Sequence, residues 1–251
     1  MTEDPEATNP LAGTVADMSI DTSATLGDLV TADPRRARIL ERFGIDYCCS
    51  GERSLADASH DAGLDLAEVT NALDIPDGTS APQAQVPAEN AVLAHDIVDT
   101  HHAYMWEEMP RLQALVDKVH TVHGSRHPEL ARVHAAYTEA VTALDPHMTT
   151  EERVVFPAIS RLEKSRGKVG SGSFAGPIEQ LRAEHDAVGE LFKEIRTLTG
   201  GYAAPDDACN SYRAMLTGLE EMELDLHEHI HKENNILFPR VLTLEQQVAG
   251  A

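Results

Sequence analysis

Two segments of the chain, 82 residues apart, repeat the pattern His-x3-Glu-x4-Phe-Pro. The first, "HMTTEERVVFP", begins at His147, and the second, "HIHKENNILFP", begins at His229. On an α-helix, residues four apart lie on the same face, so each segment would present an imidazole and a carboxylate in one direction. A single pair of this kind is usually a surface feature. Two pairs in register indicate an internal duplication, with two helices facing each other across a common core.

The stretches that precede the two motifs also match each other. "DTHHAYMWEEMP" contains His101 and His102, and "LRAEHDAVGELF" contains His185. His102 precedes His147 by 45 residues and His185 precedes His229 by 44. Each half therefore offers one histidine from its first helix, and a histidine and a glutamate from its second.

Four histidines and two glutamates are more ligands than one metal ion needs. They suit two metal ions bridged by two carboxylates and a small oxygen ligand, as in helical bundles whose ligands project inward. Iron, manganese and zinc all accept imidazole and carboxylate, so the ligand types do not separate these metals. Such a centre leaves open positions at which a small molecule could bind.

Helical periodicity extends over most of the chain and predicts an all-α fold. Four amphipathic stretches, at about 89–121, 128–163, 177–199 and 206–242, predict an up-down four-helix bundle with a di-metal core over residues 89–245. Pro110 and Pro146 fall inside these stretches and are expected to kink or break the helices.

The residues before the bundle form a separate section. We expect a disordered N-terminus over 1–23, a small helical domain over 24–74, and a linker over 75–88. In the small domain, Asp33-Pro34 indicates the start of a helix and Gly44 its end. Cys48 and Cys49 follow that helix and precede a further helix start, where a lowered thiol pKa is expected.

The charge balance excludes several classes of partner. With 20 basic and 42 acidic residues the net charge is −22, which repels nucleic acid and anionic membranes and attracts cations. No run approaches the roughly 18–20 apolar residues of a membrane span. The acidic N-terminus lacks an apolar signal segment, and three cysteines do not make a disulfide framework. We therefore expect a reduced, cytoplasmic protein.

Five stretches resemble a known family: "FGIDYCCSGERSLADA", "HHAYMWEEMPRL", "HMTTEERVVFPAI", "EHDAVGELF" and "HIHKENNILFPR". Residues 89–245 resemble a hemerythrin-like domain, and residues 24–74 resemble the small N-terminal domain of the iron–sulfur cluster repair di-iron proteins of the ScdA/YtfE type. The resemblance implies two non-haem iron ions per chain, oxo- and carboxylate-bridged. The ligands it implies are His102, His147, Glu151, His185, His229 and Glu233. His102 is preferred to His101 because the family pattern His-x7-Pro fits His102 and Pro110.

Residues near the ligands are expected to tune the centre. Glu184 precedes His185, and Asp225 lies one turn before His229, where it could accept the free ring N–H of a ligand imidazole. Family members often carry a glutamate one turn before the second-helix histidine, whereas this chain has Ala143 there. We expect His227 and His231, on either side of His229, to face solvent.

The function implied by the resemblance is repair of iron–sulfur clusters damaged by nitrosative or oxidative stress, by supplying iron. Damaged iron–sulfur proteins would be the clients, Cys48 and Cys49 would act as an iron or thiol relay, and the chain could form a homodimer. Two alternatives stay open. One is a binder or sensor of oxygen or nitric oxide, and the other is a di-iron enzyme that reduces nitric oxide or peroxide.

Overall fold

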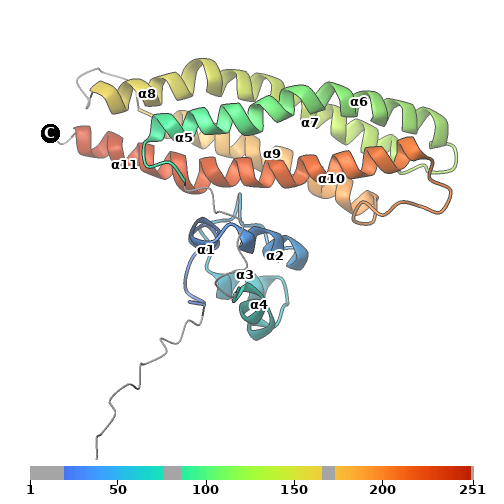
Figure 1. Ribbon diagram of the computed structural model, residues 1–251, viewed down its shortest axis with the longest axis horizontal. Coiled ribbons are helices and arrows are strands. Elements are labelled where there is room, and N and C mark those ends of the chain that lie inside the picture. Colours follow the sequence, from blue (N-terminus) through green and yellow to red (C-terminus); the bar gives the residue numbers. More distant parts are fainter. Residues whose placement is uncertain (1–19, 76–85, 166–172, 250–251) are drawn as a thin grey trace, which may run out of the picture.

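Two helical domains in contact make up the described part of the molecule (Figure 1). The computed structural model describes residues 20–75, 86–165 and 173–249. Most of the expected disordered N-terminus and most of the expected linker lie outside these ranges. The smaller domain consists of α1 (Leu26–Ala32), α2 (Arg35–Phe43), α3 (Leu55–Asp61) and α4 (Leu66–Leu73). It lies beneath the bundle in Figure 1, beside the helix that carries the second repeat.

Short polar side chains begin the helices of the small domain. The side chains of Thr25, Ser54 and Asp65 each accept a hydrogen bond from a backbone N–H in the first turn of α1, α3 and α4. The helix α2 ends at Gly44, whose φ of 70° is the left-handed conformation that glycine adopts without strain. This helix end is the one predicted from the sequence.

The larger domain is an up-down four-helix bundle, which confirms the predicted fold class. Its helix α6 packs against α7 and α10, and α9 packs against α7 and α10. The four rods span residues 90–123, 130–165, 175–198 and 210–249. Their segments are α5 (Asn90–Ile97), η1 (Val98–His102) and α6 (Ala103–His123); α7 (Leu130–Thr150), η2 (Glu151–Val155) and α8 (Phe156–Ser165); α9 (Ala175–Leu198); and α10 (Asn210–His231), η3 (Lys232–Leu237) and α11 (Phe238–Ala249).

Three of the rods change from α-helix to π-helix for about one turn. The π segments η1, η2 and η3 contain His102, Glu151 and Glu233 respectively. A π-helix carries an extra residue per turn, and such segments are frequent at functional sites. These segments were not predicted from the sequence.

Two prolines were expected to kink or break their helices, and neither of them breaks its helix. Pro110 lies inside α6 and Pro146 inside α7, and both helices continue through them. Both prolines are exposed. Water can therefore solvate the carbonyl group that each proline leaves unpaired, and packing of the opposite helix face outweighs the local cost.

The apolar core has two parts. One extends from the small domain through α6, α7, α9 and α10, and the other joins α5, α8, the start of α9, η3 and α11. The repeated motifs lie where the first part gives way to the second. The candidate site is therefore enclosed by apolar packing on both sides.

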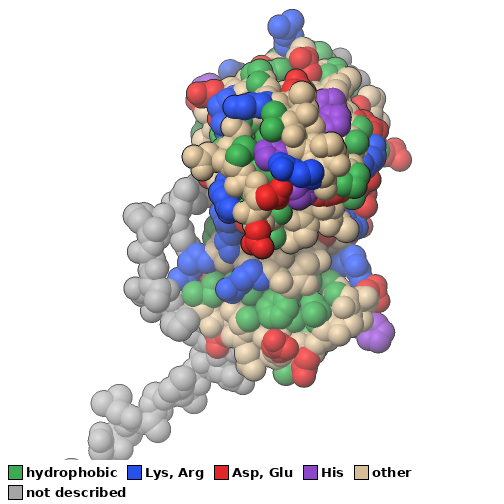
Figure 2. All heavy atoms as spheres, turned by 90° about the vertical axis from the view of Figure 1, so that its right-hand side faces the viewer, with side chains coloured by type: hydrophobic (Ala, Val, Ile, Leu, Met, Phe, Trp, Pro, Cys, Tyr) green, Lys and Arg blue, Asp and Glu red, His purple; other side chains and the backbone are tan. Residues whose placement is uncertain are grey.

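The small domain docks on the bundle through residues that flank the second repeat. The ring of Tyr47 makes edge contacts with His227 and His231, at centroid distances of 6.2 and 5.6 Å. His231 also lies 3.3 Å from the Thr31 hydroxyl and is 4% exposed. The expectation that His231 faces solvent was therefore wrong, because Thr31 and Tyr47 of the small domain lie against it. Figure 2 shows the small domain in contact with the bundle above it.

The described helices include none with the length and apolar character required to cross a membrane.

Candidate metal centre

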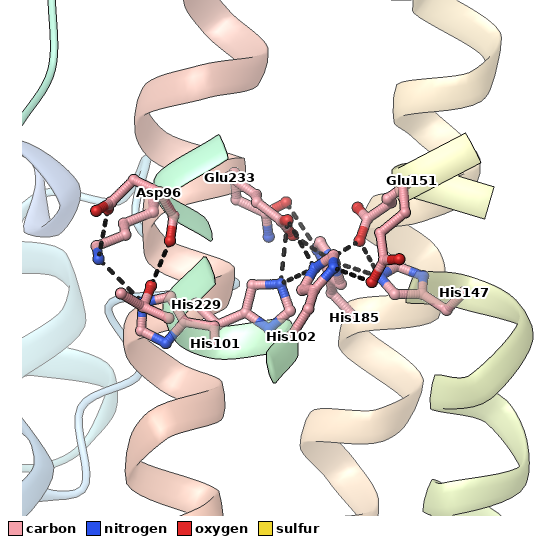
Figure 3. A network of polar contacts seen from close by, with 12 residues as sticks. Asp96, His101, His102, His147, Glu151, His185, His229 and Glu233 are labelled. Carbon is pink, nitrogen blue, oxygen red and sulfur yellow. Dashed lines mark hydrogen bonds and ion pairs between the residues drawn. The ribbon is translucent and has the colours of Figure 1, made fainter. Parts of the chain in front are cut away.

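Six polar side chains from all four rods converge in the interior of the bundle (Figure 3). They are His102, His147, Glu151, His185, His229 and Glu233. Their ligand atoms form two groups, in each of which all atoms lie within 4.8 Å of one another. One group is His102, Glu151, His229 and Glu233, and the other is His147, Glu151, His185 and Glu233. Both glutamates belong to both groups.

The Nε2 atoms of all four histidines face the two carboxylates. In the first group, His102 Nε2 lies 3.4 Å from Glu151 Oε2, and His229 Nε2 lies 3.1 Å from Glu233 Oε1. In the second group, His147 Nε2 lies 3.4 Å from Glu151 Oε2 and His185 Nε2 lies 3.1 Å from Glu233 Oε2. The two glutamates thus stand between two pairs of imidazoles. This is the arrangement that two cations sharing two carboxylate bridges would use.

The site is deeply buried, which makes its charges costly without a cation. Glu151 and Glu233 are both 0% exposed, and both oxygens of Glu151 and Oε2 of Glu233 have no hydrogen-bond partner. Burial and the nearby Glu233 raise the pKa of Glu151 to about 8. Burial lowers the pKa of His229 to about 3. Two buried carboxylates that face four imidazole Nε2 atoms fit a divalent cation centre.

Three of the four imidazoles are held by an acceptor at their other ring nitrogen. His102 Nδ1 lies 3.1 Å from Glu152 Oε1, His147 Nδ1 lies 2.7 Å from Glu184 Oε2, and His185 Nδ1 lies 3.0 Å from Asn234 Oδ1. Because a carboxylate only accepts, the proton of His102 and His147 is held at Nδ1, and Nε2 keeps its lone pair for a metal. Glu184 thus acts on His147 from the neighbouring helix α9.

The hydrogen bonds that Glu152 and Asn234 make to histidines of the centre were not predicted from the sequence. Each residue immediately follows a glutamate of the repeated motif, so the duplication itself held the signal that could have found them. Glu152 also accepts a hydrogen bond from Trp106 Nε1 at 2.9 Å.

The role expected for Asp225 was wrong. Its Oδ1 lies 2.9 Å from Nδ1 of His101, not of a ligand, while Nδ1 of His229 is buried without a hydrogen-bond partner. His101 stacks on His229 with a centroid distance of 5.5 Å and an interplanar angle of 2°. Asp225 therefore fixes the imidazole that packs on the ligand, because the ring of His101 stands between the acid and the centre.

Cys48 and Cys49 lie outside the bundle, in the loop between α2 and α3. Their Sγ atoms are 3.9 Å apart, and the Cys48 thiol donates to Asp46 Oδ1 at 3.2 Å. The three side chains form a further group that could hold a metal ion. The expected lowered pKa is wrong for Cys48. Its hydrogen bond with Cys49, its burial and the Asp46 carboxylate raise the pKa of this thiol well above its ordinary value.

Each of the two domains matches a known protein family. Residues 93–241 match the hemerythrin HHE cation binding domain. Residues 22–76 match ScdA_N, described as a domain of unknown function (DUF542).

Curated relatives match most of the chain. The chain is 38% identical over 223 residues to the iron-sulfur cluster repair protein YtfE of Yersinia pestis (strain Pestoides F), which covers 87% of this chain and 96% of the relative. The YtfE protein of Yersinia pseudotuberculosis serotype O:1b (strain IP 31758) matches with the same identity and coverage. The chain, in which an ScdA_N domain precedes a hemerythrin HHE domain, therefore belongs to the family of the iron-sulfur cluster repair proteins YtfE.

Proposed function

We propose that the chain holds two iron ions in the bundle and supplies iron to damaged iron–sulfur proteins. The observation that carries this proposal is the pair of overlapping groups that share Glu151 and Glu233. Each ion would have two histidine ligands, His102 and His229 for one, and His147 and His185 for the other. The bound ions would neutralise both buried carboxylates and supply a redox-active centre.

Repair by iron supply agrees with the ligand types. Imidazole and carboxylate bind ferrous iron without the soft thiolate ligands that hold iron in clusters. Iron held in this way can be transferred to the thiolates of an apo-cluster protein. The names of the relatives, which are iron-sulfur cluster repair proteins, support the same substrate class. The iron is then both bound at the site and transferred to the client protein.

The cysteine pair is suited to a relay because of where its loop lies. A Cβ placed on Gly189 would be 3.8 Å from Cys49 Sγ, so this thiol lies against α9 one turn beyond the ligand His185. Cys48 and Cys49 line a cavity of about 710 Å³ between the two domains. We infer that iron leaving the bundle is taken up by these thiols and Asp46 before it reaches the client.

Nitric oxide or oxygen could also bind at the open positions of the two irons. A carrier or a reductase of these molecules keeps its iron through a cycle, whereas a repair protein gives its iron away. The amount of iron that remains on the chain after the reaction therefore distinguishes the two functions.

The test is to mix the iron-loaded chain with an apo iron–sulfur protein, sulfide and a reductant. We expect iron to leave the chain while the absorbance of the client's cluster appears. Replacing both Cys48 and Cys49 with serine should slow the transfer and leave the iron content of the bundle unchanged. A chain that retains its iron while it consumes nitric oxide or peroxide would contradict the proposal.

A further inference from the structure

The residue after the shared glutamate has the same task in both halves of the bundle. Glu152 follows Glu151 and accepts from the first-helix histidine His102 of its half. Asn234 follows Glu233 and accepts from the first-helix histidine His185 of its half. The duplication thus includes a residue that orients a ligand. The two supports differ in charge, since one is a carboxylate and the other a neutral amide.

The two supports also differ in their surroundings. The side chain of Glu152 is 30% exposed and lies on the outside of the bundle beside Trp106. Asn234 is 6% exposed and lies under the small domain, where its Nδ2 is 3.5 Å from the carbonyl oxygen of Cys48. A carbonyl oxygen only accepts hydrogen bonds, so the amide group must direct its NH2 to Cys48 and its oxygen to His185. One side chain therefore joins the cysteine loop to a ligand of the metal centre.

The cysteine loop is held in this position by the next residue, Asn235. Its Nδ2 donates to the carbonyl oxygens of Tyr47 at 3.1 Å and Cys48 at 3.0 Å. The close approach requires a glycine at position 51, because a Cβ there would lie 2.6 Å from Asn235 Nδ2. A side chain at Gly51 would displace the amide group of Asn235 and weaken its hydrogen bonds to the Tyr47 and Cys48 carbonyls, which hold the loop beside Asn234.

We propose that Asn234 is a positioning residue that holds His185 with Nε2 toward the metal, and that this hold depends on the docked cysteine loop. The inference rests on the proposed function, because it assumes that His185 binds iron. A carboxylate such as Glu152 holds its histidine by its own charge. The neutral amide of Asn234 is oriented by the Cys48 carbonyl. Moving the loop therefore weakens the hydrogen bond to His185, and the iron bound by His185 is held less tightly. The loop that carries the two thiols thereby influences the release of the iron that they would receive.

The experiment measures the rate at which a ferrous chelator removes iron from the full, iron-loaded chain. Asn234→Leu removes the acceptor while keeping a similar volume, and it should release one iron about 10- to 100-fold faster, the usual cost of losing the partner of a ligand histidine. Gly51→Ala should accelerate the release of the same iron. Gly176→Ala, on α9, is the matched control, since a Cβ there meets nothing within 4 Å.

Asn234→Asp provides a rescue that a purely structural role would not show. Its carboxylate can hold His185 without help from Cys48, so iron release should be slow in both the wild-type and the Gly51→Ala backgrounds. Alkylation of Cys48, which is 4% exposed in the docked loop, reports whether the loop has moved. If the alkylation rate of Cys48 is unchanged in Gly51→Ala, the larger side chain of Gly51→Val is used to move the loop. Alkylation of Cys48 and iron release are then measured in that variant.

Unchanged iron release in Asn234→Leu would overturn the positioning role. Faster alkylation of Cys48 in the position-51 variant, with release as slow as in the wild type, would overturn the dependence on the loop. A wild-type chain that binds no iron would instead refute the proposed function, so the two failures can be told apart.

Discussion

At the scale of single residues, the aromatic position of each repeat supports a histidine of the candidate centre. Phe156 stacks on His102 at 5.8 Å, and Phe238 stacks on His185 at 6.3 Å with an interplanar angle of 3°. The motif therefore encodes, within one helix, a histidine and a glutamate of the candidate centre and the apolar surface on which a histidine of the neighbouring helix rests. This explains why the phenylalanine recurs along with the histidine and the glutamate.

Phe238 is 0% exposed, so its removal should leave a cavity beside His185. We expect Phe238→Ala to lower the free energy of unfolding by about 3–5 kcal/mol, from lost burial and the cavity together. Denaturant titration of the metal-free chain measures this change. Val154→Ala, at a position that is 58% exposed, should change the same quantity by less than about 0.5 kcal/mol. Similar small losses in both variants would show that the ring is not a core residue.

Glu184 should contribute to metal affinity through His147. Removing its carboxylate in Glu184→Ala leaves Nδ1 of His147 without its 2.7 Å partner. We expect iron affinity at one position to fall about 10- to 100-fold, as competition with a chelator would measure. Glu190→Ala, at an exposed position of the same helix that pairs with Lys193, is the control. Equal iron affinities in the two variants would show that Glu184 does not support iron binding through His147.

The six converging residues could be predicted from the sequence because each recurs at the same place in both halves. The residues that hold the imidazoles were harder to predict. Glu152 and Asn234 lie one residue beyond the shared glutamates, about 100° further round a regular helix, where a side chain would not be expected to reach the same site. Asp225 shows the opposite error, since its position one turn from His229 was correct but His101 intervenes.

At the scale of the elements, periodicity predicted the four rods to within a few residues at most ends, because each buries one apolar face. It could not predict the π segments, which preserve that apolar face while inserting a residue. It also overestimated the effect of Pro110 and Pro146, which lie on the solvent side of their helices. Local propensity was overridden by packing at both positions.

A buried acid on α10 should make the stability of the bundle depend on pH. Glu223 is 3% exposed, accepts from the Tyr202 hydroxyl at 2.9 Å and lies 3.2 Å from Arg196. Burial raises the pKa of Glu223 although Arg196 opposes the shift. A carboxyl group with a raised folded pKa stabilises the fold below its unfolded pKa of about 4.3, and this contribution is lost as the pH rises through the folded value.

The variant Glu223→Gln cannot ionise, so its thermal midpoint relative to the wild type should increase between pH 5 and pH 8. Differential scanning calorimetry of the metal-free proteins gives this difference directly. Glu220→Gln, at an exposed position of the same helix, controls for the loss of one charge. A difference that stays constant or decreases with rising pH would contradict the expected direction.

At the scale of the whole molecule, the docking of the small domain was not predictable from either domain alone. It depends on pairs from distant parts of the sequence, such as Gly51 with Asn235 and Tyr47 with His231. Periodicity within one segment carries no information about these pairs. Docking places Cys48 and Cys49 beside the helix that carries His185, which connects the two domains in one proposed function.

Iron content per chain shows whether two irons share Glu151 and Glu233. We expect about two irons in the wild type, about one in His147→Ala, and nearly none in Glu151→Ala, because a shared bridge serves both positions and a terminal histidine serves one. The protein would be loaded anaerobically with ferrous iron, desalted and measured by atomic emission. Retention of two irons in Glu151→Ala, or binding of only one iron by the wild type, would contradict the shared di-iron centre.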